Sequence, residues 1–122
     1  MTTTRYGIKE NQVRAFNKMI RVSHQKLNLV CDLVRGLPVD RAVDVLKFSK
    51  KRVAGEVLKT LLSAVANAEH NKGLNKEDLF VAEGYANQGP TLKRGIWRGR
   101  GGHDIILKRT CHITFVLDSV NK

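Results

Sequence analysis

The sequence predicts an α+β fold: a compact body of three helices packed on a small antiparallel three-stranded sheet, with one long protruding β-hairpin. Three observations predict it. Apolar residues recur with helical spacing three times between residues 24 and 71. From residue 79 the apolar period becomes two, as in strands. A glycine-rich connection over residues 88–104 then separates two strand-like segments, and it is far longer than a common hairpin loop.

The chain has 122 residues, which suits one domain with one core. Within this single domain, residues 1–122, we expect three parts. They are a loose N-terminal arm over residues 1–12, a globular body over 13–87 and 105–119, and an extended hairpin loop over 88–104.

A strand and two helices are expected to follow the arm. The segment RAFNKMIRV at 14–22 alternates weakly and is interpreted as a strand. Ser23 offers an N-cap to the first helix, and Gly36 ends it. Pro38 starts a second helix that reaches about Phe48. The apolar stripes of the two helices are Leu27, Val30, Cys31 and Val34, then Val39, Ala42, Val43 and Leu46.

A third helix is expected over roughly residues 50–71, with Ser49 as its cap. Its stripe is Ala54, Val57, Leu58, Leu61, Val65 and Ala68. The first turn would then read KKR, which opposes the helix dipole. These cations either face an external anion or form a solvated helix end.

Two strands are expected in the C-terminal part of the chain, at 79–87 and 104–119, because β-branched and aromatic residues are frequent there. In the second strand, Cys111, Ile113, Phe115 and Leu117 share one face, and His112, Thr114, Val116 and Asp118 share the other. Cys111 and His112 therefore point to opposite faces and cannot form a nucleophile pair.

Several kinds of site are excluded by spacing. The stretch GRGGHD matches neither GxGxxG nor GxxxxGK[ST], so it predicts no nucleotide loop. The four histidines and two cysteines lack metal-ligand spacing, and both cysteines are expected to be reduced and apolar in character. The longest nearly apolar run, at 61–68, is too short to span a bilayer. We therefore expect no enzyme, cofactor, metal, small-molecule substrate or membrane partner.

The charge of the chain indicates a polyanionic partner. Lys and Arg total 22 against 11 acidic residues, a formal net charge of +11. The surplus is uneven, with local sums of +5 over residues 1–35, +3 over 36–59, −2 over 60–92 and +5 over 93–122. Glycines of the hairpin loop let the backbone approach phosphates, and Trp97 offers a face for base stacking. Such a loop suits either a free-standing RNA-binding or annealing protein or a protein built into a larger RNA assembly.

Four segments, in order and spacing, resemble one known family. They are IRVSHQKLNLVCDLVRGLPVDRAVDVLKF, LLSAVANAEHNKGL, GPTLKR and HITFVL. Over about residues 12–118 the chain is similar to the twenty-second protein of the large ribosomal subunit, the L-twenty-two family. The resemblance implies a structural, non-catalytic constituent of the large subunit, in a bacterial cytoplasm or an organelle matrix. Its partners would be large-subunit rRNA, neighbouring ribosomal proteins and the nascent polypeptide, because the family's hairpin lines the peptide exit tunnel.

The resemblance and the charge pattern together nominate rRNA-binding residues. By resemblance, SHQK at 23–26 and NAEHN at 67–71 touch rRNA or brace the helices. At the hairpin tip the chain departs from the family, with WRG at 97–99 and GG at 101–102 in place of a Pro-Arg-Ala segment and a further Arg. The hairpin candidates are Lys93, Arg94, Trp97, Arg98, Arg100, His103, Lys108 and Arg109. The body candidates are Arg14, Arg21, Ser23, Lys26, Lys50, Lys51, Arg52, Asn67, His70 and Asn71.

Overall fold

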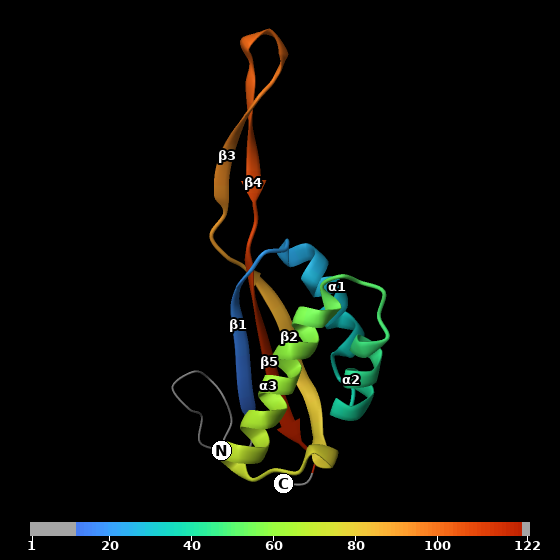
Figure 1. Ribbon diagram of the computed structural model, residues 1–122. Helices are drawn as coiled ribbons and strands as arrows, with labels where there is room; N and C mark the ends of the chain where they lie inside the picture. The colour runs from blue at the N-terminus through green and yellow to red at the C-terminus, as the bar shows by residue number, and fades with distance from the viewer. Residues whose placement is uncertain (1–11, 121–122) are drawn as a thin grey trace.

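The computed structural model describes residues 12–120, so the expected arm lies outside the described residues except for Gln12. The elements are β1 (Val13–Ile20), α1 (His24–Val34), α2 (Val39–Lys47), α3 (Ala54–Lys72), β2 (Leu79–Gln88), β3 (Leu92–Trp97), β4 (His103–Lys108) and β5 (Cys111–Ser119). Short 3₁₀ turns occupy Lys76–Asp78 and Gly99–Gly101. Three helices and a three-stranded sheet form the body, and a hairpin projects from it (Figure 1). The predicted fold class is confirmed.

Strand β5 is the centre of the body sheet, which has the order β1-β5-β2 and is antiparallel throughout. One face of β5 presents Cys111, Ile113, Phe115 and Leu117, all with no exposed surface, as the alternation predicted. Helix α3 packs across β1 and β5, and α1 packs on β2, so these side chains meet the helical stripes in one core. Gly84 of β2 makes room for the Phe115 ring, because a Cβ at Gly84 would lie 2.7 Å from a ring carbon.

The first two helices begin and end close to the predicted positions. Ser23 is the N-cap residue of α1 with extended backbone, although its side chain makes no cap hydrogen bond. Gly36 follows α1 with φ +83°, a conformation that favours glycine. Pro38 precedes α2 and fixes the backbone entry to it.

The predicted start of the third helix was wrong. Helix α3 begins at Ala54, four residues later than expected, and Val53 is its N-cap residue. Ser49 instead accepts a hydrogen bond from the Lys51 amide at 3.3 Å, which makes a local turn before the helix. The helix starts where apolar burial starts, and its first turn contains Glu56, which the dipole favours. The KKR segment precedes the helix, so these cations are not in its first turn as was expected.

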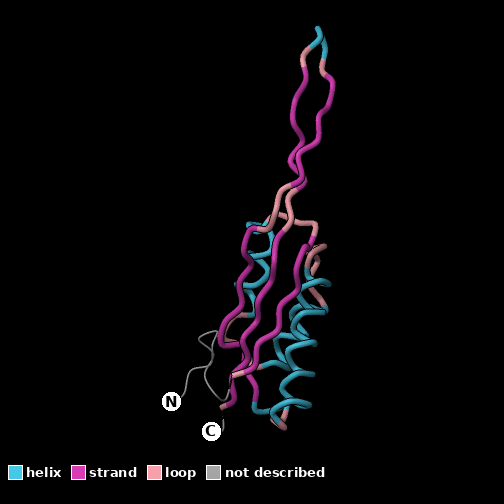
Figure 2. The backbone as a smooth tube through the Cα atoms, turned by 90° about the vertical axis from the view of Figure 1, so that its left-hand side faces the viewer, coloured by secondary structure: helices cyan, strands magenta, loops and turns pink. Residues whose placement is uncertain are grey.

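The protruding hairpin is a second, separate sheet of β3 and β4, paired from Leu92↔Lys108 to Trp97↔His103 (Figures 1 and 2). Residues 88–104 are therefore mostly strand and turn, where a loop was expected. Residues 105–108, which the sequence analysis placed in the body, belong to β4, the second strand of the hairpin. Every residue from Leu92 to Arg109 is exposed.

A narrow neck joins the hairpin to the body. The Gly89 amide donates to the Thr110 carbonyl at 2.9 Å, and the Thr110 hydroxyl donates to the Pro90 carbonyl. Pro90 has no amide hydrogen and cannot extend the ladder, which explains why the strands separate here. A Cβ at Gly89 would lie 2.7 Å from the Thr110 hydroxyl oxygen, so the neck requires glycine at this position.

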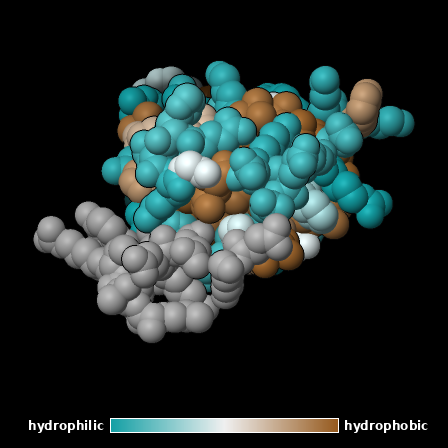
Figure 3. Space-filling view, turned by 90° about the horizontal axis from the view of Figure 1, so that it is seen from below, coloured by the Kyte–Doolittle hydropathy of each residue, from teal (hydrophilic) through white to brown (hydrophobic). Residues whose placement is uncertain are grey.

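The face of the body opposite the hairpin is mostly polar. Seen from below, opposite the hairpin, hydrophilic side chains surround scattered apolar ones (Figure 3).

Both cysteines are fully buried, and burial raises the pKa of the Cys31 thiol to about 11. The expectation that they act as small apolar residues agrees with these positions. No helix among the described residues is long and apolar enough to cross a bilayer.

The exposure of the whole hairpin predicts that the body folds without it. Replacing residues 92–108 with a short glycine turn should shift the melting temperature by less than about 5 °C, which corresponds to roughly 1 kcal/mol for a domain of this size. As a control, Phe115→Ala should cost about 3–5 kcal/mol, because that side chain is fully buried. Thermal melts followed by circular dichroism give both values. Loss of the cooperative transition in the hairpin variant would show that the hairpin packs on the body.

Candidate nucleic-acid interface

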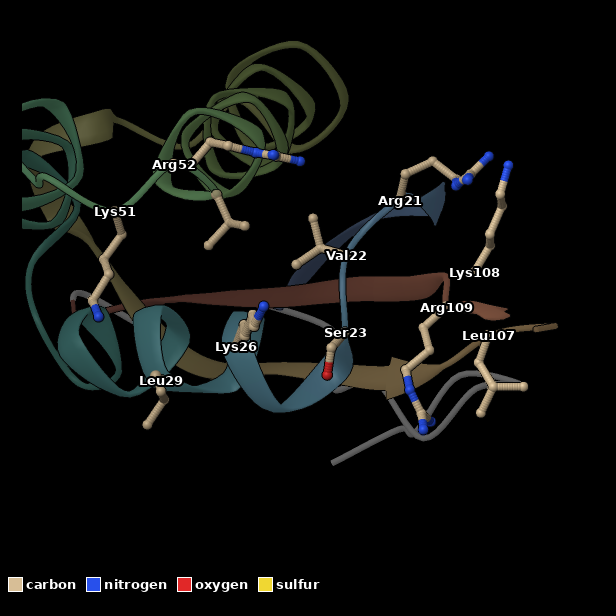
Figure 4. Close-up of a pocket in the computed structure, with 11 residues that line it drawn as sticks. Arg21, Val22, Ser23, Lys26, Leu29, Lys51, Arg52, Leu107, Lys108 and Arg109 are labelled. Carbon is tan, nitrogen blue, oxygen red and sulfur yellow. The ribbon is translucent and has the colours of Figure 1, made fainter. Parts of the chain in front are cut away.

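A basic groove lies where the hairpin meets the body (Figure 4). It is a hollow of about 850 Å³. Cations from separate parts of the chain line it: one follows β1, one is on α1, two precede α3, and two are at the base of the hairpin. They are Arg21, Lys26, Lys51, Arg52, Lys108 and Arg109, and with Val22, Ser23, Leu29, Val53 and Leu107 they define the groove.

The groove concentrates positive charge without compensation. Its lining, as the structure describes it, contains six cationic side chains and no carboxylate. In Figure 4 the Arg21 and Lys108 side chains extend in the same direction, although they come from segments far apart in sequence. Like charges around one hollow repel one another, and an anion in the groove would relieve that repulsion. Six cations around one hollow suit a run of phosphates better than a single carboxylate.

The structure brings together seven of the predicted residues in this groove. Ser23 joins the six cations, and its hydroxyl lines the same hollow. Lys50 is exposed beside the groove but does not line it. This set of cations depends on the loop between α2 and α3, because that loop places Lys51 and Arg52 in the same lining as Lys26 of α1.

Other predicted residues lie elsewhere on the body. Arg14 is on β1, where its guanidinium carbon lies 4.7 Å from the centre of the Phe16 ring. Asn67 of α3 donates to the Arg14 carbonyl at 3.5 Å and so braces α3 against β1. His70 and Asn71 are exposed in the last turn of α3. For Asn67 the contact observed is bracing, one of the two roles that the resemblance implied.

The remaining candidates follow the hairpin to its tip. Arg98 pairs with Asp104 across the strands at 2.8 Å, and the tip turns at Arg100 with φ +60°. Trp97 is 83% exposed, and its ring centre lies 6.0 Å from that of His103. The indole therefore stands beside His103 with one side open to solvent. Lys93 and Arg94 are exposed nearer the body.

Sequence reasoning missed the apolar part of the groove. Leu29 of α1 is 60% exposed and lines the groove, as does Leu107 at the base of the hairpin. Exposed leucines between cations offer contacts to the ribose and base surfaces that phosphates leave uncovered. A signal was present for Leu29, which lies off the buried stripe of its helix.

Metal chemistry finds no support in the part of the chain that the structure describes. No group of three or more His, Cys, Asp or Glu side chains lies close enough to hold an ion among residues 12–120. The groove contains cations and apolar groups only, apart from the Ser23 hydroxyl. Its chemistry is therefore that of anion binding.

A compact α+β body with a cationic groove and an exposed cationic hairpin defines a class of small, basic nucleic-acid-binding proteins. The family model described as "Ribosomal protein L22p/L17e" matches residues 15–118. The chain belongs to this ribosomal protein family, as its resemblance in sequence indicated.

Relatives agree with the family match. A protein of Magnetococcus marinus named "Large ribosomal subunit protein uL22" is 53% identical over 103 residues, covering 84% of this chain and 91% of its own length. A protein of the same name from Agrobacterium fabrum is 48% identical over 119 residues, covering 98% and 92%. A third, from a Thermoanaerobacter species, is 47% identical over 106 residues, covering 87% and 96%. The likeness therefore extends over the body and the hairpin together.

The groove predicts a specific change in RNA affinity. The double variant Lys26→Gln/Arg52→Gln should bind structured RNA more weakly, and the slope of log K against log salt should fall by roughly 1.4–1.8, since each lost phosphate contact removes about 0.7–0.9. The matched control is Lys47→Gln/Lys59→Gln, which removes two exposed cations that do not line the groove. Fluorescence anisotropy at several salt concentrations gives both slopes. Equal losses in the two variants would mean that net charge, and not the groove, determines binding.

Proposed function

We propose that this protein is a structural constituent of the large ribosomal subunit. It binds large-subunit rRNA, supports assembly of the subunit, and extends its hairpin along the wall of the nascent-peptide exit tunnel during translation. It acts in a bacterial or organellar ribosome. Its partners are the rRNA, neighbouring large-subunit proteins and the nascent polypeptide.

The observation that carries this proposal is the basic groove at the foot of the hairpin, in a chain that belongs to a ribosomal protein family. The cations of the groove come from three segments of the chain, residues 21–26, 51–52 and 108–109, which meet only in the folded body. It can hold an RNA backbone in a fixed position relative to the hairpin. Phosphate contacts position a protein on RNA without reading its sequence, which is what a structural constituent requires.

The hairpin suits insertion into folded RNA. It is two strands wide, and all its side chains from Leu92 to Trp97 and from His103 to Lys108 are exposed. Six paired residues per arm correspond to about 20 Å of ladder. Its leucine and isoleucine side chains have no core partner in the described residues, so surrounding rRNA would supply the packing that the body does not.

Body cations are proposed to provide most of the docking affinity, and the hairpin cations local contacts. The groove cations converge on one hollow, whereas hairpin cations are spread along a thin ladder and one of them, Arg98, pairs with Asp104. Ser23 contributes a hydroxyl in the groove. Asn67, His70 and Asn71 are proposed to hold the far end of α3 against β1 and rRNA.

Neutralising body cations should therefore impair assembly more than neutralising hairpin cations. We compare Arg21→Gln/Lys26→Gln/Lys50→Gln/Lys51→Gln with Lys93→Gln/Arg94→Gln/Arg98→Gln/Arg100→Gln, which remove four charges each. Each variant competes with labelled wild-type protein for incorporation into large subunits, which are then isolated after a high-salt wash. The body variant should be displaced several-fold more readily. The opposite ranking would reverse the roles, and loss of wild-type protein in the wash would favour a free-standing RNA-binding protein.

Trp97 tests the position of the hairpin tip. Because stacking on one base contributes only about 1–3 kcal/mol, Trp97→Ala should still assemble. It should change the chemical reactivity of rRNA nucleotides at the tunnel wall and the response to drugs that occupy the tunnel. Trp97→Phe, which keeps an aromatic face, should restore most of the wild-type footprint. Unchanged footprints in the alanine variant would show that the indole contacts no rRNA.

A further inference from the structure

The sheet of the body has an outward face that no described helix covers. Helices pack on the face that carries Ile113 and Phe115, and the alternate residues of the three strands point the other way. Phe16 of β1 and Tyr85 of β2 both lie opposite Thr114 of β5 in the ladder. The three residues therefore form one row across this outward face.

That row holds two exposed aromatic rings separated by a small side chain. Phe16 is 47% exposed and Tyr85 36% exposed. Each flanks Thr114 on a neighbouring strand, so their backbones are about 10 Å apart, twice the spacing of paired strands. Aromatic rings arranged on an open antiparallel sheet are a common platform on which single-stranded RNA bases stack.

Cations flank the Phe16 ring along its strand. The Arg14 guanidinium carbon is 4.7 Å from the ring centre, and the Lys18 amine is 5.2 Å from it. These cations frame a hollow of about 490 Å³ together with polar groups of β2 and β5. Its lining is Arg14, Phe16, Lys18, Asn87, His112 and Thr114.

A bulge in β1 gives the hollow its polar end. The register between β1 and β5 shifts between Asn17 and Ile20, and Met19 adopts φ +60° there. The Met19 amide donates to His112 Nδ1 at 3.1 Å, which leaves Nε2 as the donor of that ring. Asn87, paired with His112 in the ladder, adds an amide that can donate and accept. Polar groups of this kind suit the edge of a nucleobase.

We propose that this outward sheet face is a second RNA site that binds unpaired nucleotides, whose bases stack on Phe16 and Tyr85 and whose phosphates lie against Arg14 and Lys18. This inference rests on the proposed function for one point, which is that the bound RNA would be ribosomal RNA. It shares no lining residue with the basic groove. Two RNA segments can therefore be bound at once, one by its backbone in the groove and one by its exposed bases on the sheet.

The chemistry of the face favours RNA over a protein partner. A protein interface is centred on a continuous apolar patch with few charges. Here the Phe16 ring lines a hollow with polar and cationic side chains, and Arg14 and Lys18 make the β1 side positive. Tyr85 lies opposite Thr114, and the residues two positions away on its strand, Glu83 and Asn87, are also polar. Within the described strands, the exposed acidic residue on this face is Glu83 of β2. Glu83 and Arg14 are both paired with Val116 of β5, so Glu83 is separated from β1 by the central strand. A phosphate backbone would thus run along β1.

The test measures binding of the full chain to a short single-stranded RNA that carries a fluorescent adenine analogue, and to an RNA duplex. Phe16→Leu/Tyr85→Leu keeps apolar surface and removes both rings. We expect roughly tenfold or greater loss of single-strand affinity, loss of the stacking-induced quenching, and little change for the duplex. The matched control is Phe48→Leu, an aromatic residue 81% exposed elsewhere on the body. The groove variant Lys26→Gln/Arg52→Gln should show the reverse, with the larger loss for the duplex.

Each outcome decides the proposal. If the double leucine variant melts at a lower temperature, the pair Phe16→Leu and Phe16→Tyr replaces it, and only Phe16→Tyr should retain quenching. Unchanged single-strand affinity and quenching would overturn the proposal. It would also be overturned if subunits carrying the leucine pair kept every rRNA footprint and lost a neighbouring protein. Assembly of the wild-type chain into subunits tests the proposed function separately, because the oligonucleotide measurement needs no ribosome.

Discussion

Every other part of the molecule depends on the pairing of β5 with β1 and β2. The inner face of β5 is the centre of the core, against which α1 and α3 pack. On its N-terminal side β5 connects through Thr110 to β4, the second strand of the hairpin. One ladder therefore fixes both the body and the direction in which the hairpin leaves it, and the hydrogen bonds between Gly89, Pro90 and Thr110 close the body at that point.

This arrangement explains how a small domain tolerates so many cations. Hydrophobic burial on one side of a three-stranded sheet stabilises the body, and the cations are placed outside that layer. Around the groove they come from segments that approach one another only because α1, the loop before α3 and the hairpin base are anchored to the same sheet. The free energy of the core thus holds like charges together. An anionic partner would relieve the repulsion between these charges. Because the folded body already holds the cations in place, binding would require little further ordering of the protein.

Most of the fold could be predicted from the sequence, because its core-facing residues follow simple periods. The apolar stripes of α1 and α2 and the alternate residues of β5 each lie on one buried side of their element, as the sequence periods predicted. The start of α3 could not be read in this way, since Ser49 has the chemistry of a cap but serves a turn. A protruding hairpin was predicted, but its first arm, Leu92–Trp97, was expected to be part of a loop, because that segment has no buried face to impose alternation. The groove was predicted as separate cations, whereas its shape depends on tertiary packing that no local pattern contains.

The three-segment origin of the groove links RNA binding to folding. Arg21, Lys51 and Lys108 are distant in sequence and meet only in the native state, so the unfolded chain presents no equivalent hollow. A ligand that binds the native state alone stabilises it by RT ln(1 + [L]/Kd), about 2.7 kcal/mol at a hundredfold excess over Kd. Inside an RNA assembly the local concentration of phosphate backbone is very high, so RNA bound in the groove would give the body stability that it lacks when free. If RNA binds the groove as proposed, docking is coupled to folding, and the bound protein resists unfolding more strongly than the free protein does.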